Sequence, residues 1–450
     1  MIFVIVPTIA FLSFFLGRYI FKRWFNHISL FAFIWMGMIM LYELRLLPYK
    51  EIVPATWLFI AATFISFILG TLTYVSLKRL FPSQNPKSDE RNREFNKIFA
   101  DDAKVIRYSL FLFSFISIAG AVQHWMVLID MFGSIPKVFL NALTIYRMNT
   151  EEGGIKGQVP FVSNFGYVAV FWGAVYTAYK GKFTFLSILP FIGIIIKETS
   201  TIGRAGILLG LFEFIFVFLL FRHCLTINDK EKFRFSRPNA TISITFLLAL
   251  LIFAASVVKI SRVSFEQYQG ASKTLRELEG NIILSPSVYL YLSAHLGVLN
   301  EFVKRQDERT LFAQNTFLPV YNFLDRLDIV KRPNQYQKGY FIPMWVNTGT
   351  FIRELFADFN VFGLLLFPYL LGFFMTYLWF RLVREGSLYI LVILSYLYII
   401  IGFSFLVMIT RTSYWSISLT LNLLTIFVIS QIVKSKQRNK TEVSLGTIRS

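Results

Sequence analysis

The chain has 450 residues, of which 55% are hydrophobic, 18% aromatic and only 16% charged. With a mean hydropathy of +0.58, this composition excludes a disordered, collagen-like or ordinary water-soluble protein. The single cysteine, Cys224, excludes an internal disulfide framework. A net charge of +19 on so apolar a chain indicates basic loops facing lipid headgroups or phosphates, and no nucleic-acid-binding motif accompanies it. We therefore expect an all-α polytopic integral membrane protein.

Runs of about 20 apolar residues, the length a helix needs to cross roughly 30 Å of hydrocarbon, predict the transmembrane helices. The first run is interpreted as a retained span, because no basic region precedes it and no small-residue cleavage site follows it. We expect eleven spans, near 2–21, 28–42, 55–77, 106–129, 160–179, 183–202, 205–221, 240–258, 359–380, 387–409 and 412–433.

The basic residues of the short loops predict the orientation. One set of alternate loops holds 23 Lys and Arg and the other holds 8. Because basic residues stay in the cytoplasm during insertion, the richer set is cytoplasmic and the N-terminus is outside. The expected organisation is eight helices with short loops over 1–258, a large extracytoplasmic loop over 259–358, three helices over 359–433 and a basic cytoplasmic tail over 434–450.

This topology limits where the chemistry can take place. The cytoplasmic loops are too short to form a nucleotide-binding domain of about 100 residues. The sequence has no Walker-type glycine loop and no Asp-x-Asp pair of the kind that holds a metal against a nucleotide sugar. We therefore expect a substrate that reaches the outer leaflet already activated, and no cofactor or metal.

The span at 183–202 is unusual because its apolar part stops at Ile196. Lys197 and Glu198 then lie near the outer hydrocarbon boundary, and Arg204 follows as the chain turns back. Two interpretations stay open. The basic side chains extend to lipid phosphates and pair with Glu198, or they bind the pyrophosphate of a lipid carrier.

Within the outer loop, Ser285-Pro286 and the apolar stripe after it predict a capped amphipathic helix on the membrane face of the loop. Basic residues flank this helix, including Arg262 and Arg276 before it. They either form a solvated face or contribute to substrate binding. His295 is the one histidine of the loop, and it is either a packed side chain or a base.

The segment 345–363 leads from the outer loop into the ninth span. Here the chain resembles the O-antigen and oligosaccharide repeat-unit polymerases, whose pattern is Asn-x-x-Thr, a short aromatic-rich helix, and Asp-Phe-Gly-x-x-Gly. The matching residues are Asn347, Thr350, Asp358, Phe359 and Gly363, whereas Asn360 stands where the family most often has Gly. Gly-Arg-Ala at 203–205, the many spans and the single large outer loop extend the resemblance over most of the chain.

The resemblance implies a glycosyltransferase at the outer face of the bacterial cytoplasmic membrane. Such enzymes transfer a growing glycan from polyprenyl pyrophosphate to an incoming lipid-linked repeat unit. Cations stabilise the leaving pyrophosphate, and a carboxylate or His accepts the proton of the acceptor hydroxyl. We assign Arg204 and Lys197 to the pyrophosphate, Arg353 to the same group or to glycan, and Asp358, Glu354 or His295 to the base. A capping role at the ninth span is the alternative for Asp358. Asn347 and Tyr340 are further candidates for substrate binding, although outer-edge aromatic residues also form the normal interface belt.

Two other activities stay open at this stage, as does a non-enzymatic role as a scaffold of a polysaccharide export machine. An O-antigen ligase shares the spans, the loop and the pyrophosphate chemistry, and differs in its acceptor, lipid A core. A lipid-linked oligosaccharide flippase or other transporter would more often show repeated halves. The expected partners are the polyprenyl-pyrophosphate-linked oligosaccharide and membrane lipids, with a chain-length regulator and a flippase as further candidates, and no nucleic acid.

Overall fold

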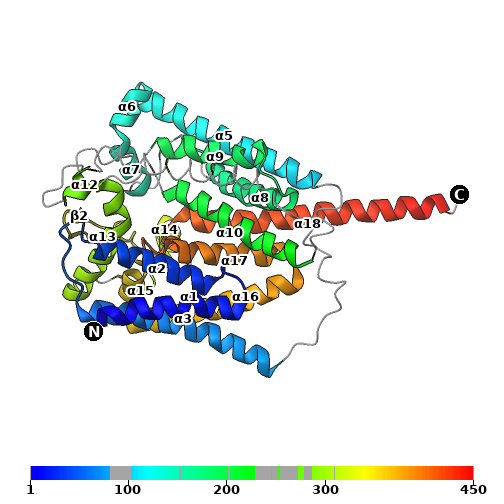
Figure 1. The fold of residues 1–450 in the computed structure, drawn as a ribbon. Coiled ribbons are helices and arrows are strands. Elements are labelled where there is room, and N and C mark those ends of the chain that lie inside the picture. The colour runs from blue at the N-terminus through cyan, green and yellow to red at the C-terminus, as the bar shows by residue number, and fades with distance from the viewer. Residues whose placement is uncertain are drawn as a thin grey trace.

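The computed structural model describes residues 2–81, 103–151, 155, 157–159, 161–200, 203, 205–228, 245, 252, 272–277, 286–308 and 310–448. Nearly all of this part is helical (Figure 1). The first half contains α1 (Ile2–Phe21), α2 (His27–Glu43), α3 (Pro54–Leu80), α5 (Lys104–Phe132), α6 (Ile135–Leu140), α7 (Ala142–Glu151), η2 (Val162–Asn164), α8 (Phe165–Lys180), α9 (Phe185–Thr199) and α10 (Ala205–Asn228). The second half contains α12 (Lys273–Glu277), α13 (Pro286–Arg305), α14 (Leu318–Arg326), β1 (Tyr340–Phe341), β2 (Trp345–Val346), α15 (Phe351–Phe359), α16 (Val361–Glu385), α17 (Leu388–Phe403), η4 (Ile409–Arg411) and α18 (Ser413–Ile448).

The described helices have the length and composition of a membrane protein. Five are long and apolar enough to cross a bilayer: α3, α5, α10, α16 and the part of α18 up to Val433. Shorter apolar helices occupy Ile5–Phe21, His27–Glu43 and Leu388–Phe403. The expected all-α membrane class is therefore confirmed. The predicted span at 240–258 lies almost wholly outside the described residues.

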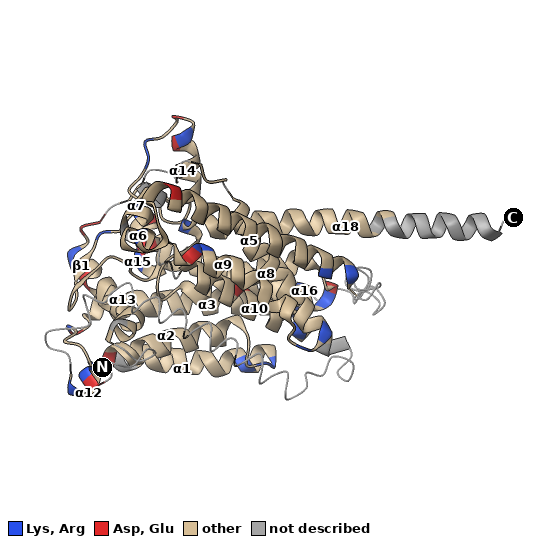
Figure 2. Ribbon diagram, turned by 90° about the horizontal axis from the view of Figure 1, so that it is seen from above, with Lys and Arg blue, Asp and Glu red and all other residues tan. Residues whose placement is uncertain are grey.

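The helices form an elongated bundle with two polar ends. Figure 2 shows Lys, Arg, Asp and Glu gathered mainly at these ends, with few charged residues on the helices between them. One end holds α12 to α15 and the start of α1, whereas α18 runs out beyond the opposite end (Figure 1). We call the end formed by α12 to α15 the outer layer, because it contains much of the segment predicted to be extracytoplasmic. A middle with few charges between polar ends is the distribution that a bilayer favours.

Close packing of α3 against α16 holds one side of the bundle. Gly70 of α3 approaches the backbone carbonyl of Tyr369, and Gly372 of α16 approaches the carbonyl of Phe67, so that a Cβ atom at either glycine would clash with backbone. Small residues allow such approach between helices that lack a hydrophobic driving force within lipid. The pair α3–α16 therefore gives the outer layer a rigid support.

The amphipathic helix predicted from Pro286 is present as α13, but its apolar stripe packs on protein. Leu296 and Leu299 are fully buried, and α13 packs against α2. Asn300 accepts hydrogen bonds at Oδ1 from the backbone N–H of Val53 (2.9 Å) and from the Thr56 hydroxyl (3.0 Å). The apolar stripe therefore faces the bundle, where it contacts α2, and hydrogen bonds to Val53 and to Thr56 of α3 fix the helix there.

The span predicted at 387–409 ends as a helix at Phe403. Ser404 then accepts a hydrogen bond at its carbonyl from the N–H of Phe351 (2.9 Å) and one at Oγ from Trp35 Nε1 (3.0 Å). The backbone carbonyl of Ser404 is thus satisfied by α15, and its side-chain hydroxyl by α2, where the helix ends. This break brings η4 and Arg411 under the outer layer.

Candidate functional site

The site candidates gather around α15, the helix of the outer layer that packs against α16 of the bundle. Its apolar residues Phe351, Ile352 and Leu355 are fully buried, which fixes the helix in place. Arg353 and Glu354 are also buried, at 0% and 1% exposure. Because they are consecutive, their side chains point in different directions along the helix and reach different partners.

Arg353 is bound entirely by protein groups. Its Nε and Nη2 atoms donate to Glu308 Oε2 at 2.8 and 2.6 Å. Nη2 also donates to the carbonyl of Lys338 (2.6 Å), and Nη1 donates to the carbonyl of Asn347 (3.2 Å). The guanidinium lies 5.1 Å from the ring centroid of Tyr340. Arg353 therefore joins the segments around residues 308, 338 and 347 in this structure, and its donors do not face open space.

Tyr340 and Asn347 lie at the edge of this ion pair. The Tyr340 hydroxyl donates to Asp307 Oδ1 (2.7 Å), and Lys338 pairs with Asp307 Oδ2 (2.8 Å). Burial, together with this hydrogen bond, raises the pKa of Tyr340 above its ordinary value. Tyr340 is buried, so its ring is not available for stacking on sugar, whereas the side chain of Asn347 is exposed.

Glu354 faces the opposite way, toward the bundle. Its carboxylate forms an ion pair with Arg411 and accepts a hydrogen bond from the backbone N–H of Met408. Burial raises the pKa of Glu354 to about 7, against the opposing effect of Arg411. Arg411 also donates to the carbonyl of Gln335 (3.1 Å), and its side chain is 10% exposed. The chain thus places a carboxyl group that can titrate near neutrality beside an arginine.

Asp358 holds the segment 310–316 in place. Oδ1 accepts from the Thr310 hydroxyl, the Asn315 N–H and Asn315 Nδ2, each at 3.0 Å. Oδ2 accepts from the N–H and the hydroxyl of Thr316 at 2.8 and 2.9 Å. The N-cap residue of α16 is Asn360, so the predicted capping role of Asp358 at this span is wrong. Both carboxylate oxygens are engaged, so a substrate hydroxyl would have to displace a protein donor.

The backbone geometry after Asp358 explains why the motif has Asn or Gly at position 360 and Gly at position 363. Asn360 has φ +53°, a left-handed conformation that glycine adopts more readily, and the resembling family most often has Gly at this place. Gly363 approaches the backbone carbonyl of Leu355, where a Cβ atom would clash. The Asp-Phe-Asn-x-x-Gly motif therefore builds the sharp turn from α15 into α16.

His295 is packed and hydrogen-bonded. It is 1% exposed, its Nδ1 lies 2.9 Å from the carbonyl of Thr348, and its Nε2 lies 2.6 Å from the carbonyl of Tyr291. Carbonyl oxygens only accept hydrogen bonds, so both ring nitrogens already face acceptors. This geometry favours the packed interpretation over the base.

Four basic residues remain among the candidates from the sequence. Arg204 and Arg262 lie outside the described residues, and Arg276 lies exposed on α12. Lys197 pairs with Glu198 at 3.0 Å, and its ammonium group lies 5.8 Å from the ring centroid of Tyr414. This ion pair agrees with the interpretation in which Lys197 pairs with Glu198 and does not bind the lipid carrier. The pair belongs to α9, which is far from α15 along the chain.

A cluster of positive charge surrounds Glu301 on α13. Lys50, Lys304 and Arg305 each lie 3.4 Å from its carboxylate. Burial opposes the ionisation of Glu301, but Lys304 and Lys50 outweigh it and hold its pKa below the ordinary value. Three cations on one carboxylate leave a net positive charge at the outer end, where an anionic substrate group could bind.

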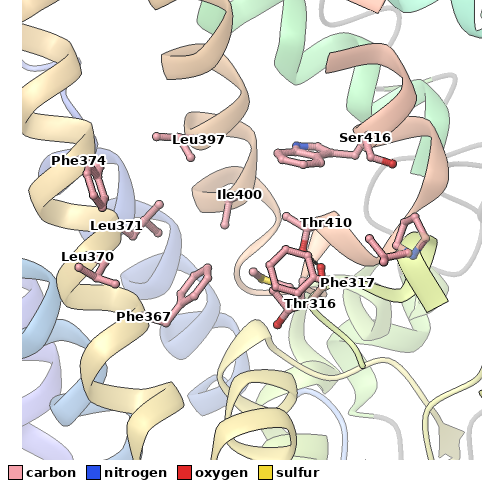
Figure 3. A pocket seen from close by; sticks show the side chains of 14 residues that line it. Thr316, Phe317, Phe367, Leu370, Leu371, Phe374, Leu397, Ile400, Thr410 and Ser416 are labelled. Carbon is pink, nitrogen blue, oxygen red and sulfur yellow. Dashed lines mark hydrogen bonds between the residues drawn. The ribbon is translucent and has the colours of Figure 1, made fainter. Parts of the chain in front are cut away.

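An apolar cavity of about 310 Å³ opens between the bundle and the outer layer. Figure 3 shows Leu371 and Phe367 of α16, Ile400 of α17, and Thr316 and Thr410 at its polar end. The Thr410 hydroxyl donates to the carbonyl of Thr316 at 2.8 Å, and Arg411 follows directly. The cavity is therefore lined by hydrocarbon along three helices, and its lining residue Met408 donates its backbone N–H to Glu354, the partner of Arg411.

Glu308, Arg411 and Lys50 are the candidate residues that sequence reasoning missed. Each lies outside the long helices, and its partner is distant along the chain, so no local pattern marks the pair. The pair Glu308–Arg353 spans 45 positions, and Arg411–Glu354 spans 57. Among the described residues, no group of three or more His, Cys, Asp or Glu side chains is placed to hold a metal ion.

Comparison with known proteins adds no relative. A scan against protein-family models, a search of the curated proteins and a search of the solved structures each return no match for this chain.

Proposed function

We propose that this protein is a membrane glycosyltransferase that polymerises polyprenyl-pyrophosphate-linked oligosaccharide repeat units at the outer face of the bacterial cytoplasmic membrane. Eleven spans, an outside N-terminus and a cytoplasmic C-terminus belong to the same proposal. The observation that supports it best is the apolar cavity, because its lining residue Met408 donates its backbone N–H to Glu354, the ion-pair partner of Arg411. A lipid-linked donor needs this combination, because its chain is hydrocarbon and its pyrophosphate is anionic.

In this proposal the isoprenoid chain enters the cavity between α16, α17 and α18, and its first units contact Leu371 and Ile400. The pyrophosphate then lies at the level of Arg411. A planar guanidinium can donate two hydrogen bonds to phosphate, and fixed positive charge stabilises the leaving group as the glycosidic carbon is attacked. Arg204, named from the resemblance, is a second candidate for the same group.

Of the three candidates we choose Glu354 as the base, because its carboxylate accepts two hydrogen bonds from protein, from Arg411 and from the Met408 N–H, against five at Asp358. The Glu354 pKa of about 7 suits a group that accepts a proton near neutral pH. Asp358 accepts five hydrogen bonds from protein donors, and both nitrogens of His295 face carbonyl oxygens. In our proposal Glu354 therefore accepts the proton of the acceptor hydroxyl, and Asp358 orders the segment at the mouth of the cavity.

The glycan profile of a deletion strain tests the activity. Loss of long chains with a single repeat unit retained indicates a polymerase, and complementation with the wild-type gene should restore the ladder. A core without any repeat unit would indicate a ligase or a flippase and would contradict the proposal.

A lipid-linked oligosaccharide transporter is the second candidate. The observation that favours it is Glu213, a fully buried carboxyl group within α10. Such intramembrane acids often mark ion or proton pathways in transporters. The glycan profile separates this candidate from the polymerase.

For the site named from the resemblance, we expect Arg204→Ala to remove polymer while protein level and single-unit product stay unchanged. Arg204→Lys should restore activity only in part, because a point charge loses the paired hydrogen bonds of a guanidinium. Full activity in Arg204→Ala would remove this residue from the proposal.

A further inference from the structure

Three polar side chains from three helices meet in the bundle interior. Glu213 of α10, Tyr396 of α17 and Asn422 of α18 have exposures of 0%, 1% and 0%. The Tyr396 hydroxyl and Asn422 Nδ2 each lie 3.0 Å from Glu213 Oε1. Nδ2 also lies 3.1 Å from the Tyr396 hydroxyl. Glu213 Oε1, the Tyr396 hydroxyl and Asn422 Nδ2 therefore form a triangle in which each pair of atoms is hydrogen-bonded.

The cluster has no counter-charge in the described part of the chain. None of the ion pairs found there includes Glu213, and both of its hydrogen-bond partners are neutral. Other titratable groups on these helices are Arg222, His223 and Cys224 of α10, Tyr176, Tyr179 and Lys180 of α8, Tyr389 and Tyr398 of α17, and Tyr414 of α18. Tyr167 of α8 interacts electrostatically with Glu213, and α9 carries the Lys197–Glu198 ion pair. Because the charges of that pair compensate each other, an ionised Glu213 would be an isolated anion in a low-dielectric interior, which is strongly disfavoured.

The hydrogen-bond pattern indicates which ligand the cluster can hold. Glu213 Oε2 and Asn422 Oδ1 are buried without a hydrogen-bond partner among the described residues. A metal cation would meet the amide N–H donors that point at Oε1, whereas a proton on Oε2 leaves those bonds intact. The arrangement therefore fits a proton better than a metal ion.

We propose that Glu213 is a proton-binding site in the membrane interior, and that its proton occupancy sets the position of the cavity wall. Tyr396 makes an edge-to-face contact with Trp415, at 5.6 Å between ring centroids, and Trp415 lines the apolar cavity. Loss of the proton strengthens the hydrogen bonds from Tyr396 and Asn422 to the carboxylate. The tightening draws α17 and α18 toward α10 and shifts Trp415. This inference concerns the cavity itself and does not depend on the reaction proposed above.

Labelling with dicyclohexylcarbodiimide tests whether Glu213 holds a proton. The reagent adds to protonated carboxyl groups in apolar surroundings, and the rearranged acylurea keeps all of its atoms, so peptide mass spectrometry locates it. Glu198 is the internal control, because it is buried but paired with Lys197. We expect labelling of Glu213 at pH 7 well above that of Glu198, falling by about tenfold for each pH unit once the carboxyl titrates. Equal labelling of the two residues, or labelling of Glu213 that does not fall with pH, would overturn the proposal.

Thermal unfolding of full-length variants in detergent gives a second test that does not need reagent access. Glu213→Gln keeps a neutral group of the same size, so we expect its midpoint within about 2 °C of the wild type at pH 7. Folding keeps the proton bound at Glu213, so this contribution is present at low pH and is lost as the pH rises. Between pH 7 and 10 the wild type should therefore fall below Glu213→Gln. A Gln variant that melts as low as Glu213→Ala at pH 7 would show that a charge is required.

The proposed coupling between the protonation of Glu213 and the position of Trp415 in the cavity wall can be measured separately. The fluorescence of Trp415 is obtained as the difference between the wild type and Trp415→Phe. It should shift with pH in the wild-type background and stay constant in the Glu213→Gln background. A pH-dependent shift that persists in Glu213→Gln would contradict the coupling.

Discussion

Buried charges are accommodated differently in the outer layer and in the membrane bundle. In the outer layer, Arg353 and Glu354 are fully buried, and each has a partner of opposite charge, Glu308 and Arg411. In the bundle, Glu213 is equally buried but has only neutral partners. Burial alone therefore does not decide ionisation in this protein. The outer layer uses ion pairs to join distant loops, and the bundle holds its carboxyl group uncharged.

Removing a partner in the outer layer should have the largest effect on stability. Arg353→Ala leaves Glu308 without its cation and also frees the carbonyls of Lys338 and Asn347. Breaking such a buried pair from one side costs about 3–5 kcal/mol in unfolding free energy. Thermal unfolding in detergent measures this loss.

Arg276→Ala is the matched control, since Arg276 is exposed on α12 and should change stability by no more than about 0.5 kcal/mol. Equal unfolding midpoints for the two variants would show that the Arg353–Glu308 pair does not hold the outer layer together.

A smaller loss should follow from Asp358→Asn. The substitution replaces one acceptor oxygen by an NH₂ group that faces the donors of Asn315 or Thr316. We expect a loss of about 2–3 kcal/mol, because hydrogen bonds to a charged group are broken. Thr310→Val removes a single donor and should cost about 1 kcal/mol. If Asp358→Asn abolishes polymer while its unfolding midpoint equals that of the wild type, Asp358 is the base and not an anchor.

Glu354 gives the outer layer a pH dependence. Its pKa is raised from 4.5 to about 7 in the folded protein, so the protonated form is favoured there. Its contribution to stability is fully present below pH 4.5 and is lost as the pH rises through about 7. Relative to Glu354→Gln, the wild type should lose on the order of 1–3 kcal/mol across this range. A constant difference between the two proteins from pH 4 to 8 would contradict the raised pKa.

The smallest effect concerns the turn between α15 and α16. Asn360 adopts φ +53°, which glycine tolerates without strain. We expect Asn360→Gly to change stability by less than about 1 kcal/mol and to leave polymer formation intact. Asn360→Ala retains a Cβ and loses the side-chain amide, so it should be the less stable of the two. The reverse order would remove the backbone explanation of the motif.

The sequence predicted the helices better than the site. Apolar runs of transmembrane length identified α3, α5, α10, α16 and α18, because the bilayer constrains both length and composition. The Asp-Phe-Asn-x-x-Gly segment was also recognisable, since a tight turn restricts the residue types that can form it.

The pairing of charges could not be predicted in the same way. Arg353 was a candidate for substrate, but Glu308, 45 positions earlier, binds it in the structure. Arg411 counted only as a loop charge, and its partner Glu354 is 57 positions away. Such contacts depend on tertiary packing and leave no periodic pattern. For the same reason, the apolar stripe predicted that α13 is a helix, but it did not predict that this helix packs on α2.

Photo-crosslinking with a polyprenyl pyrophosphate that bears a benzophenone in its isoprenoid chain tests the central claim most directly. The purified protein in lipid nanodiscs would be illuminated, and the labelled peptides would be located by mass spectrometry. We predict labels on the cavity residues Leu371, Ile400 and Trp415, and a clear loss of these labels in Ile400→Trp, which fills the cavity. Arg411→Ala should weaken labelling further by removing the cation proposed to bind the pyrophosphate. Labels spread over lipid-facing residues such as Phe11 and Leu12 of α1, unchanged in Ile400→Trp, would show that the cavity does not bind the lipid carrier.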